Sequence, residues 1–358
     1  MNKKIAVIIS PNWKDYAQKY LADSLTSLAN QDYVGKLKFW LVDNATTAES
    51  FLLMQKFGQE YLVGREWVLL ANKNNDGFAK GNNGAMRMAM DEGYDYVVLF
   101  NIDGVADKAC LRELVEVIES DTRIGAVQGR IMLSPEIKKI NSLGNVTHFL
   151  GFGYSGHCGE ELEDYSKFNL TPIAYPSGAT VLFKASTLKQ VGLFDEEFWM
   201  YNEDQDLGWR LWLAGFKVVL ASSAVFYHQY ELNRSSTKYY WMDRNRLLAI
   251  FKNYHLATLV LIAPALVAVE LGLIIVAIRD GWFKEKLRVW LYFLSPLTWL
   301  YLTKARRESQ SLRKVSDRQI IKLFSGKIVF EELNGPLLKL ANFFLNIYWN
   351  LVKIIILW

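Results

Sequence analysis

The sequence predicts an α/β protein with a mostly parallel, Rossmann-like sheet and flanking helices, followed by a helical region that associates with a membrane. Apolar runs of strand length alternate with segments of helical periodicity near the start of the chain. Several of these runs end directly in a polar side chain. The last third of the chain is both basic and apolar. We therefore expect an α/β domain over residues 1–253 and a membrane-associating helical region over 254–358.

Charge is divided unevenly along the chain. Residues 1–230 contain 22 Lys and Arg against 28 Asp and Glu, and residues 231–358 contain 19 against 9, so net charges of −6 and +10 give the total of +4. A basic half can face nucleic acid or an anionic membrane. Here the basic residues alternate with long apolar runs, which favours the membrane and argues against nucleic acid. The apolar run before Pro11 is too short for a signal peptide, so we expect the first domain in the cytoplasm.

Strands and helices can be assigned in order. The continuous apolar runs "KIAVIIS", "LKFWLVDNAT", "EWVLLANKNN" and "YDYVVLFNIDG" are typical of buried strands. Helical periodicity covers residues 16–30, and further helices are expected near 82–92 and 107–119. "IGAVQGRIMLS" and "YPSGATVLFKAS" predict two later strands, joined through a Gly/Glu-rich loop near 151–166 that suits a flap over an acceptor.

Polar residues stand where four of these strands end, namely Asn12, Asp43, Asn75 and Asp103. A single polar residue in such a place commonly caps a helix or forms a turn. The carboxyl ends of parallel strands meet at one edge of a sheet, where α/β proteins bind ligands. Four polar residues at that edge therefore favour a binding crevice.

The loop "NKNNDGFAKGNNG" supplies Gly77, Gly81 and Gly84, and Asn82 with Asn83 is expected to open a helix. Glycine lets a backbone approach a ligand closely, and a helix N-terminus offers unpaired N–H groups to phosphate. The loop matches neither Gly-Lys-Ser/Thr nor GxGxxG. On these residues alone, a simple turn is an equally good interpretation.

Carboxylates mark two further places. Asp103 follows a strongly apolar strand, where it can hold Mg²⁺ or Mn²⁺ together with substrate phosphates, or else cap the next helix. Glu203 and Asp204 stand in or just before the first turn of a helix that continues to Gly215. A helix dipole stabilises acidic residues there, so a structural role is open. Three carboxylates between 203 and 206 exceed what a cap requires, which favours a general base held at a pocket.

The motifs "VDNAT", "NKNNDGFAKGNNG", "NID", "SGATVLFK", "VGLFDEEFWMYNEDQDLGWRLWLAGFK" and "VFYH" occur in the order seen in bacterial family 2 glycosyltransferases. The chain resembles their rhamnosyltransferase-like branch over roughly residues 4–253, which implies a GT-A fold. The resemblance also implies an inverting transfer from a nucleotide-sugar, with dTDP-rhamnose as a candidate donor, in the synthesis of cell-surface glycans.

The resemblance implies a role for each matching residue. Asp43 would contact the base of the nucleotide, with Asn12 in the first loop, and the segment from Asn75 to Asn82, with Gly77 and Gly81, would flank the nucleoside and diphosphate. Asn101 and Asp103 correspond to the Asp-x-Asp metal motif, and His228 would join Asp103 at Mg²⁺ or Mn²⁺. Gly178 belongs to the matched donor-site motif. Asp204 would deprotonate the acceptor, and Glu203 would position the acceptor or tune that base.

The basic region has two long apolar segments, 256–278 and 287–303, each close to the length of a membrane span. The loop between them is basic, and spanning would place it outside, against the positive-inside tendency. We therefore expect a monotopic or peripheral protein on the cytoplasmic leaflet. A polar stripe from Lys339 to Lys353 predicts an amphipathic last helix, with Trp349 and Trp358 as interfacial anchors. The same helix is compatible with packing on the first domain or on a partner subunit, as in a homo-oligomer.

The leading hypothesis is a metal-dependent inverting glycosyltransferase acting on a lipid-linked or polysaccharide acceptor. One alternative is an enzyme that makes a polyprenyl-phosphate sugar, whose phosphate acceptor needs no strong base. The other is a non-catalytic scaffold of a polysaccharide synthase complex.

Overall fold

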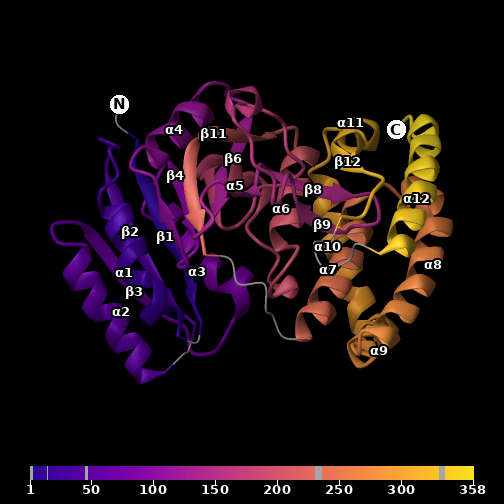
Figure 1. Ribbon diagram of the computed structural model, residues 1–358, viewed down its shortest axis with the longest axis horizontal. Helices are drawn as coiled ribbons and strands as arrows, with labels where there is room; N and C mark the ends of the chain where they lie inside the picture. The colour runs from indigo at the N-terminus through magenta and orange to yellow at the C-terminus, as the bar shows by residue number, and fades with distance from the viewer. Residues whose placement is uncertain (1–2, 14, 45–46, 230–235, 330–334) are drawn as a thin grey trace.

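The computed structural model describes residues 3–13, 15–44, 47–229, 236–329 and 335–358 (Figure 1). A nine-stranded sheet has the order β3-β2-β1-β4-β10-β6-β11-β5, with β7 paired to β6. Its strands are β1 (Ile5–Asn12), β2 (Leu37–Asp43), β3 (Glu66–Ala71), β4 (Tyr96–Phe100), β5 (Gly104–Ala106), β6 (Ile124–Leu133), β7 (Ile140–Ser142), β10 (Thr180–Lys184) and β11 (Lys217–His228). The helices that pack on it are α1 (Tyr16–Ala29), α2 (Ala48–Tyr61), α3 (Gly77–Asp91), α4 (Cys110–Glu119), α5 (Ala185–Val191) and α6 (Glu203–Leu213).

Alternate residues of the strands face opposite layers of helices. Ile5, Val7 and Ile9 of β1 pack with α1, α2 and α4, whereas Ala6 and Ile8 pack with α3, α5 and α6. Both faces of the sheet are therefore covered, which explains why the strands read as unbroken apolar runs. The predicted α/β fold with helices on both faces is confirmed.

The strand order creates a crevice at one edge of the sheet. β3, β2, β1 and β4 run parallel, and the chain moves outward from β1 to β3 before β4 returns to the other side of β1. Ligands of α/β proteins bind where the strand order reverses in this way. Beyond β4 the sheet is mixed, because β10 runs antiparallel to both β4 and β6.

Helix α3 begins at Gly77, five residues earlier than the expected start at Asn82. The backbone carbonyl of Trp199 accepts from the amides of Phe78, at 2.7 Å, and Ala79, at 3.1 Å. Two first-turn donors are thereby satisfied by a residue distant in sequence. The local sequence contains no sign of this partner, which is why the helix start was misplaced.

A second sheet, with the order β12-β8-β9, was not predicted. Its strands are β8 (Asn145–His148), β9 (Gly153–Ser155) and β12 (Phe324–Ser325). β8 and β9 lie around the loop that was expected to be a flap, and β12 comes from the C-terminal region. This small sheet therefore joins the two regions of the chain.

The C-terminal helices are α7 (Thr237–Asn253), α8 (Leu256–Arg279), α9 (Phe283–Leu294), α10 (Pro296–Ser311), α11 (Asp317–Ile320) and α12 (Pro336–Ile355). α8 and α12 lie side by side at the end of the molecule opposite α1 and α2 (Figure 1). The apolar segment 287–303 is not one helix. It is divided at Pro296, which holds Ser295 in an extended conformation.

One apolar core joins the C-terminal helices to the first domain. Trp349 of α12 is fully buried and stacks on Phe149, with ring centroids 4.7 Å apart. The prediction of Trp349 as an interfacial anchor is therefore wrong. Trp358 is half-buried, and its indole donates to the hydroxyl of Thr258 in α8 at 2.9 Å.

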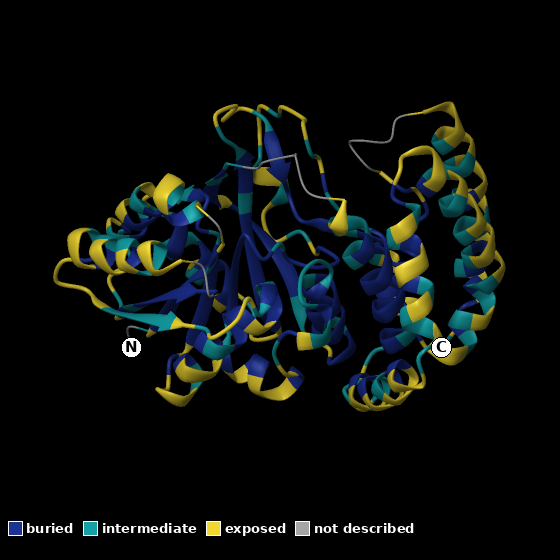
Figure 2. Ribbon diagram, turned by 90° about the horizontal axis from the view of Figure 1, so that it is seen from below, coloured by how far each residue is buried: buried dark blue, intermediate teal, exposed yellow. Residues whose placement is uncertain are grey.

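Part of the polar stripe of α12 lies against the protein, with Asn342 and Asn346 half-buried, whereas Lys339 and Asn350 are exposed. The side-chain amide of Asn342 donates to the carbonyl of Ile328 and accepts from its N–H, both at 2.7 Å. Exposed residues colour much of the outer sides of α8 and α12 in Figure 2, and many of them are large and apolar. α12 thus buries Leu345, Trp349 and Val352 and still exposes several large apolar residues, unlike a helix at the surface of a soluble protein.

Candidate active site

The ends of β1 and β2 are tied together by Asn12. Its side-chain amide donates to Asp43 Oδ1 at 3.2 Å and to Ser50 Oγ at 2.8 Å, and its carbonyl oxygen accepts from the N–H of Ala17 at 2.9 Å. Both Asn12 and Asp43 are buried. Asn12 therefore orders the loop edge on which Asp43 stands, next to the start of α1.

Asn44 organises the neighbouring loop, and sequence reasoning missed this role. Its side chain donates to the carbonyl of Gly77 at 2.8 Å and to Asn75 Oδ1 at 3.4 Å, and it accepts from Asn72 at 2.8 Å. Asn75 Oδ1 also accepts from the N–H of Gly77 at 3.1 Å. The only sequence signal was the position of Asn44 inside the "VDNAT" motif.

Three glycines of the site are required by close packing. A Cβ on Gly77 would lie 2.4 Å from the carbonyl oxygen of Trp199, and Gly77 has a φ of +69°. A Cβ on Gly81 would lie 2.6 Å from Pro11, and one on Gly178 would lie 2.7 Å from the ring of Phe78. These glycines bring α3, the first loop and the turn before β10 into contact.

Asn82 lies inside α3 and is fully buried. Its side-chain nitrogen donates to the carbonyl of Phe78 at 2.9 Å, while its Oδ1 atom has no partner in the described part of the chain. A buried acceptor without a donor is uncommon, so Asn82 carries an unmet hydrogen bond beside the glycine loop.

Asp103 and His228 meet at the end of the sheet. His228 closes β11, which pairs with β5 directly after Asp103, and its Nε2 atom lies 3.2 Å from Asp103 Oδ1 and 3.3 Å from Asn101 Nδ2. Asp103 and His228 are both buried. The structure thus brings together the three residues that were singled out for the metal motif.

Asn141 of β7 holds the His228 ring from behind, and sequence reasoning missed it. Its carbonyl oxygen lies 3.1 Å from His228 Nδ1, where it can accept a hydrogen bond from the ring. A proton on Nδ1 leaves the lone pair of Nε2 directed at Asp103. Metal-binding histidines are commonly fixed through their other nitrogen in this way. The sequence around Asn141 contains no pattern that indicates this contact with His228.

The carboxylate of Asp103 and the imidazole of His228 fit Mg²⁺ or Mn²⁺ whose remaining coordination positions are filled by a substrate and water. Among the described residues, no group of three or more His, Cys, Asp or Glu could hold a metal. A carboxylate and an imidazole nitrogen leave most coordination positions to phosphate oxygens and water, as is usual for Mg²⁺ at nucleotide sites.

Glu203 and Asp204 begin α6 in a poorly solvated place. Burial raises the pKa of Asp204 to about 6, although N–H groups of Gln205, at 2.8 Å, and Gly178, at 3.4 Å, donate to its carboxylate. Burial, and then the charge of Asp204, raise the pKa of Glu203 well above its ordinary value. Glu203 Oε2 has no partner among the described residues. The pair therefore holds protons at a pH where ordinary carboxyls are ionised.

Asp206, two residues further, has the opposite environment. It is fully buried and accepts from Arg210 at 2.9 Å and from Asn253 at 2.9 Å, and Lys252 lies 2.9 Å away. Burial opposes ionisation, but the charges of Lys252 and Arg210 outweigh it and hold the pKa of Asp206 at about 2. Asp206 is a structural anchor of α6.

The turn before Glu203 is strained and tightly held. Trp199, Tyr201 and Asn202 all have left-handed backbones, with φ of 58°, 70° and 63°. The side-chain amide of Asn245, in α7, donates to the carbonyls of Phe198, Met200 and Tyr201 at 2.7–2.9 Å. Sequence reasoning missed Asn245.

Backbone contacts join these groups into one site. The N–H of Asn101 donates to the carbonyl of Ala179 at 2.9 Å, directly after Gly178, which contacts Asp204. Trp199 caps α3, and its indole donates to the carbonyl of Asn75 at 3.4 Å. The segments that carry the glycine loop, the Asp103–His228 pair and the Glu203–Asp204 pair therefore adjoin one another.

Solved structures share this fold. GalNAc-T7, determined with UDP, GalNAc and Mn²⁺, aligns with a TM-score of 0.54 and 12% identity over 70% of this chain and 48% of its own. Residues 1–349 of TarS from S. aureus, determined with UDP, align with a TM-score of 0.50 and 16% identity over 99% of this chain and 90% of that one. The fold is that of the GT-A glycosyltransferases.

A model of the family described as "Glycosyltransferase like family 2" matches residues 3–248. The chain belongs to this family of glycosyltransferases.

Curated relatives match over limited stretches. An N-acetylglucosaminyl-diphospho-decaprenol L-rhamnosyltransferase of Mycobacterium tuberculosis is 46% identical over 57 residues, which are 16% of this chain and 19% of the relative. The low-salt glycan biosynthesis hexosyltransferase Agl10 of Haloferax volcanii is 23% identical over 60% of this chain and 67% of its own. The O-antigen biosynthesis protein RfbC of Myxococcus xanthus is 26% identical over 67% of this chain and 19% of its own.

Proposed function

We propose that the protein is an inverting glycosyltransferase in cell-surface glycan synthesis and that Asp204 is its general base. The observation that carries the proposal is the Glu203–Asp204 pair at the start of α6, in which Glu203 is buried and Asp204 half-buried, with a pKa of about 6 for Asp204. A general base works best when its pKa lies near the working pH. Glu203, which retains its proton to higher pH, would donate a hydrogen bond that orients the acceptor or tunes Asp204.

The reaction would be a single displacement. The acceptor oxygen forms a bond to the anomeric carbon while Asp204 takes the hydroxyl proton. The bond from that carbon to the donor diphosphate breaks, and the nucleoside diphosphate leaves with the electron pair. Attack opposite to the leaving group inverts the anomeric configuration. Asp103 and His228 would hold Mg²⁺ or Mn²⁺, which supplies positive charge beside the diphosphate.

Donor binding would use the carboxyl edge of the sheet. We infer that Asp43 and Asn12 flank the nucleotide base, that Asn75, Gly77, Gly81 and Asn82 line the nucleoside and diphosphate, and that Asn101 and Gly178 lie beside the transferred sugar. The unpartnered Asn82 Oδ1 and the close approaches at the three glycines support this assignment. The 57-residue match to a rhamnosyltransferase supports dTDP-rhamnose as a donor and a lipid diphosphate glycan as an acceptor.

We also infer that the region after residue 253 places the enzyme on the cytoplasmic face of a membrane without crossing it. In the described part of the chain, α8 is the one helix long and apolar enough to span a bilayer, and little of it is buried. Glu270, near its middle, pairs with Arg246 and with Lys286, at 2.6 Å. These contacts tie α8 along the protein, which supports a helix lying in the interface.

Donor binding and transfer can be measured on the same purified protein. We expect calorimetry with Mn²⁺ to detect a nucleotide-sugar among UDP-, GDP- and dTDP-linked sugars. Asp204→Asn should retain the affinity for that donor and lose transfer by at least a hundredfold. Equal loss of both would show that Asp204 only supports the fold.

Two other outcomes would replace this proposal. Transfer to a polyprenyl phosphate that survives in Asp204→Asn would indicate an enzyme that makes a polyprenyl-phosphate sugar. Absence of binding to every nucleotide-sugar tested with Mn²⁺ would indicate a non-catalytic scaffold.

A further inference from the structure

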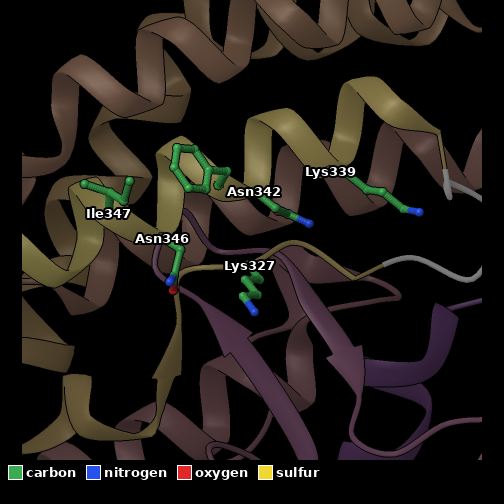
Figure 3. A pocket seen from close by; sticks show the side chains of 6 residues that line it. Lys327, Lys339, Asn342, Asn346 and Ile347 are labelled. Atoms are coloured by element: carbon green, nitrogen blue, oxygen red, sulfur yellow. The ribbon is translucent and has the colours of Figure 1, made fainter.

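A groove runs between α12 and the segment that follows β12. Its volume is about 450 Å³, and its lining residues are Lys327, Lys339, Asn342, Phe343, Asn346 and Ile347. In Figure 3 Asn342 and Asn346 extend from α12 toward the segment that carries Lys327, whereas Lys339 extends along α12 toward its start and Lys327 points away from α12. Asn342 bonds both polar groups of Ile328, which holds the two walls together.

The groove is cationic on one side. Lys327 and Lys339 are exposed, and within the described ranges neither forms an ion pair and no carboxylate lines the groove. Two ammonium groups without a counter-ion among the described residues favour an anionic ligand, and a phosphate accepts hydrogen bonds from an ammonium group.

The other side of the groove continues into an exposed apolar surface. Phe343 and Ile347 line the groove, and their side chains are 60% and 45% exposed. Further apolar residues of α12 are more than half exposed, namely Leu340, Phe344, Leu351 and Ile354. Soluble proteins bury such residues, so this surface is suited to a hydrocarbon chain or a lipid interior.

The second sheet connects the groove to the proposed catalytic base. The hydroxyl of Thr147, in β8, accepts from the side chain of Gln205 at 3.0 Å, directly beside Asp204. Thr147 also pairs with Phe324 of β12, three residues before Lys327. On the other edge of β8, the hydroxyl of Tyr154 donates to the carbonyl of Lys327 at 3.0 Å.

We propose that this groove binds the phosphate end of a lipid-linked acceptor, with Lys327 and Lys339 on the phosphates and the prenyl chain along the apolar side of α12. The acceptor glycan would then extend past β8 and β9 toward Asp204. The inference rests on the proposed function, in which the acceptor is lipid-linked, and adds the site that recognises the lipid phosphate.

Binding of farnesyl diphosphate, inorganic pyrophosphate and farnesol to the full chain tests the groove. We would use calorimetry with EDTA present, so that metal-dependent diphosphate binding at the donor site does not contribute. Farnesyl diphosphate should bind at least tenfold more tightly than pyrophosphate or farnesol, and the double variant Lys327→Glu/Lys339→Glu should bind it at least tenfold more weakly. Lys322→Glu, an equal charge change at an exposed lysine outside the groove, should bind it as the natural chain does.

Each other outcome overturns the proposal. Unchanged affinity in the double variant would remove the two lysines from recognition. Equal binding of pyrophosphate would show an anion site without a lipid component, and equal binding of farnesol would show adsorption of the prenyl chain. If phosphatidylglycerol vesicles require the same lysines while farnesyl diphosphate does not compete, the groove anchors the bilayer instead.

The failure of this inference is distinguishable from failure of the proposed function. The double variant should keep the donor affinity and the Asp204-dependent transfer to a short acceptor without lipid. Loss of Asp204-dependent transfer in the natural chain would reject the proposed function, whatever farnesyl diphosphate does.

Discussion

The side-chain nitrogen of Asn245 donates to the backbone carbonyl of Tyr201 at 2.7 Å, and the same nitrogen reaches the carbonyls of Phe198 and Met200. One amide thus holds a turn in which three residues have positive φ and which leads directly into Glu203. A strained turn persists only when its surroundings impose it.

We predict that Asn245→Asp lowers kcat about tenfold or more while the KM for the donor stays near its natural value. The carboxylate would face three carbonyl oxygens and release the turn, so that Asp204 is misplaced although the donor edge is intact. Steady-state kinetics at a temperature where the variant is folded measure the effect. Asn30→Asp, the same change at an exposed residue of the first domain, is the control. A rise in KM alone would contradict a role in placing the base.

Asp204→Asn and Asp206→Asn should change stability in opposite directions. The folded-state pKa of Asp204 is raised from 3.8 to about 6, so the unfolded chain loses this proton first and the carboxylate destabilises the fold above that window. Its removal should stabilise the protein at pH 8 by at most about 3 kcal/mol, at about 1.4 kcal/mol per pKa unit. Removal of the Asp206 charge breaks a buried network and should cost about 3–5 kcal/mol.

Urea denaturation of both variants at pH 8 gives this comparison, since the two residues lie on the same helix and the substitution is the same. Repetition near pH 4, where Asp204 is largely protonated in the fold, should remove most of the Asp204→Asn gain. A destabilised Asp204→Asn would indicate that Asp204 is a structural residue.

The rate of transfer should rise with pH through about 6. The base must be ionised, and burial sets the pKa of Asp204 near that value. We expect kcat to fall about tenfold for each pH unit below it. Glu203→Gln removes the neighbouring titrating group but keeps its shape, and its profile should show the Asp204 ionisation alone, still near pH 6 because burial sets that pKa. A flat profile between pH 5 and 8 would exclude Asp204 as the base.

His228→Ala and Asn141→Ala should both lower the affinity of the protein for Mn²⁺. Asn141 fixes the His228 ring at 3.1 Å, and loss of such a partner commonly lowers metal affinity 10- to 100-fold. Titration of Mn²⁺ in the presence of the donor measures this affinity. Asn169→Ala, outside the site, is the control. A requirement for Mn²⁺ unchanged in His228→Ala would place the metal elsewhere.

The charges beneath α8 should be coupled. Lys286 is fully buried and lies 2.7 Å from Asp243 and 2.6 Å from Glu270. Lys286→Met leaves excess buried negative charge and should cost about 3–5 kcal/mol in unfolding free energy. The double variant Lys286→Met/Glu270→Met keeps the Arg246–Asp243 pair and should recover much of that loss. Additive losses would show that the network is not coupled.

The parts of the fold that could be predicted are the strands and helices whose apolar pattern extends over many consecutive residues. The long apolar runs gave β1, β2 and β4, because a strand buried on both faces needs an apolar residue at every position. β8, β9 and β12 have only two to four residues each, which is too short for periodicity to appear. They exist through pairing with distant segments.

The same limit applies to the site. Asp103, His228, Glu203 and Asp204 stand in motifs that can be compared with a family, and the structure brings Asp103 to His228 and Asp204 to Gly178. Asn141 and Asn245 act on those motifs from elsewhere in the chain, and an isolated asparagine has no pattern that distinguishes it from a surface residue. Trp349 was misassigned because interfacial and buried tryptophans occur in the same kind of amphipathic helix.

The side chain of Thr147 contacts Gln205, the residue after Asp204, and the backbone of Thr147 pairs with Phe324. The three short strands of this sheet therefore fix the separation between the groove and Asp204. A sheet does not stretch as a loop does. If the lipid phosphate is held at one end and the reacting hydroxyl at the other, the sheet acts as a gauge of acceptor length. Glycans too short to reach from the groove to Asp204 would remain unmodified even when their lipid is bound. The enzyme would therefore act only on glycans that have reached a certain length.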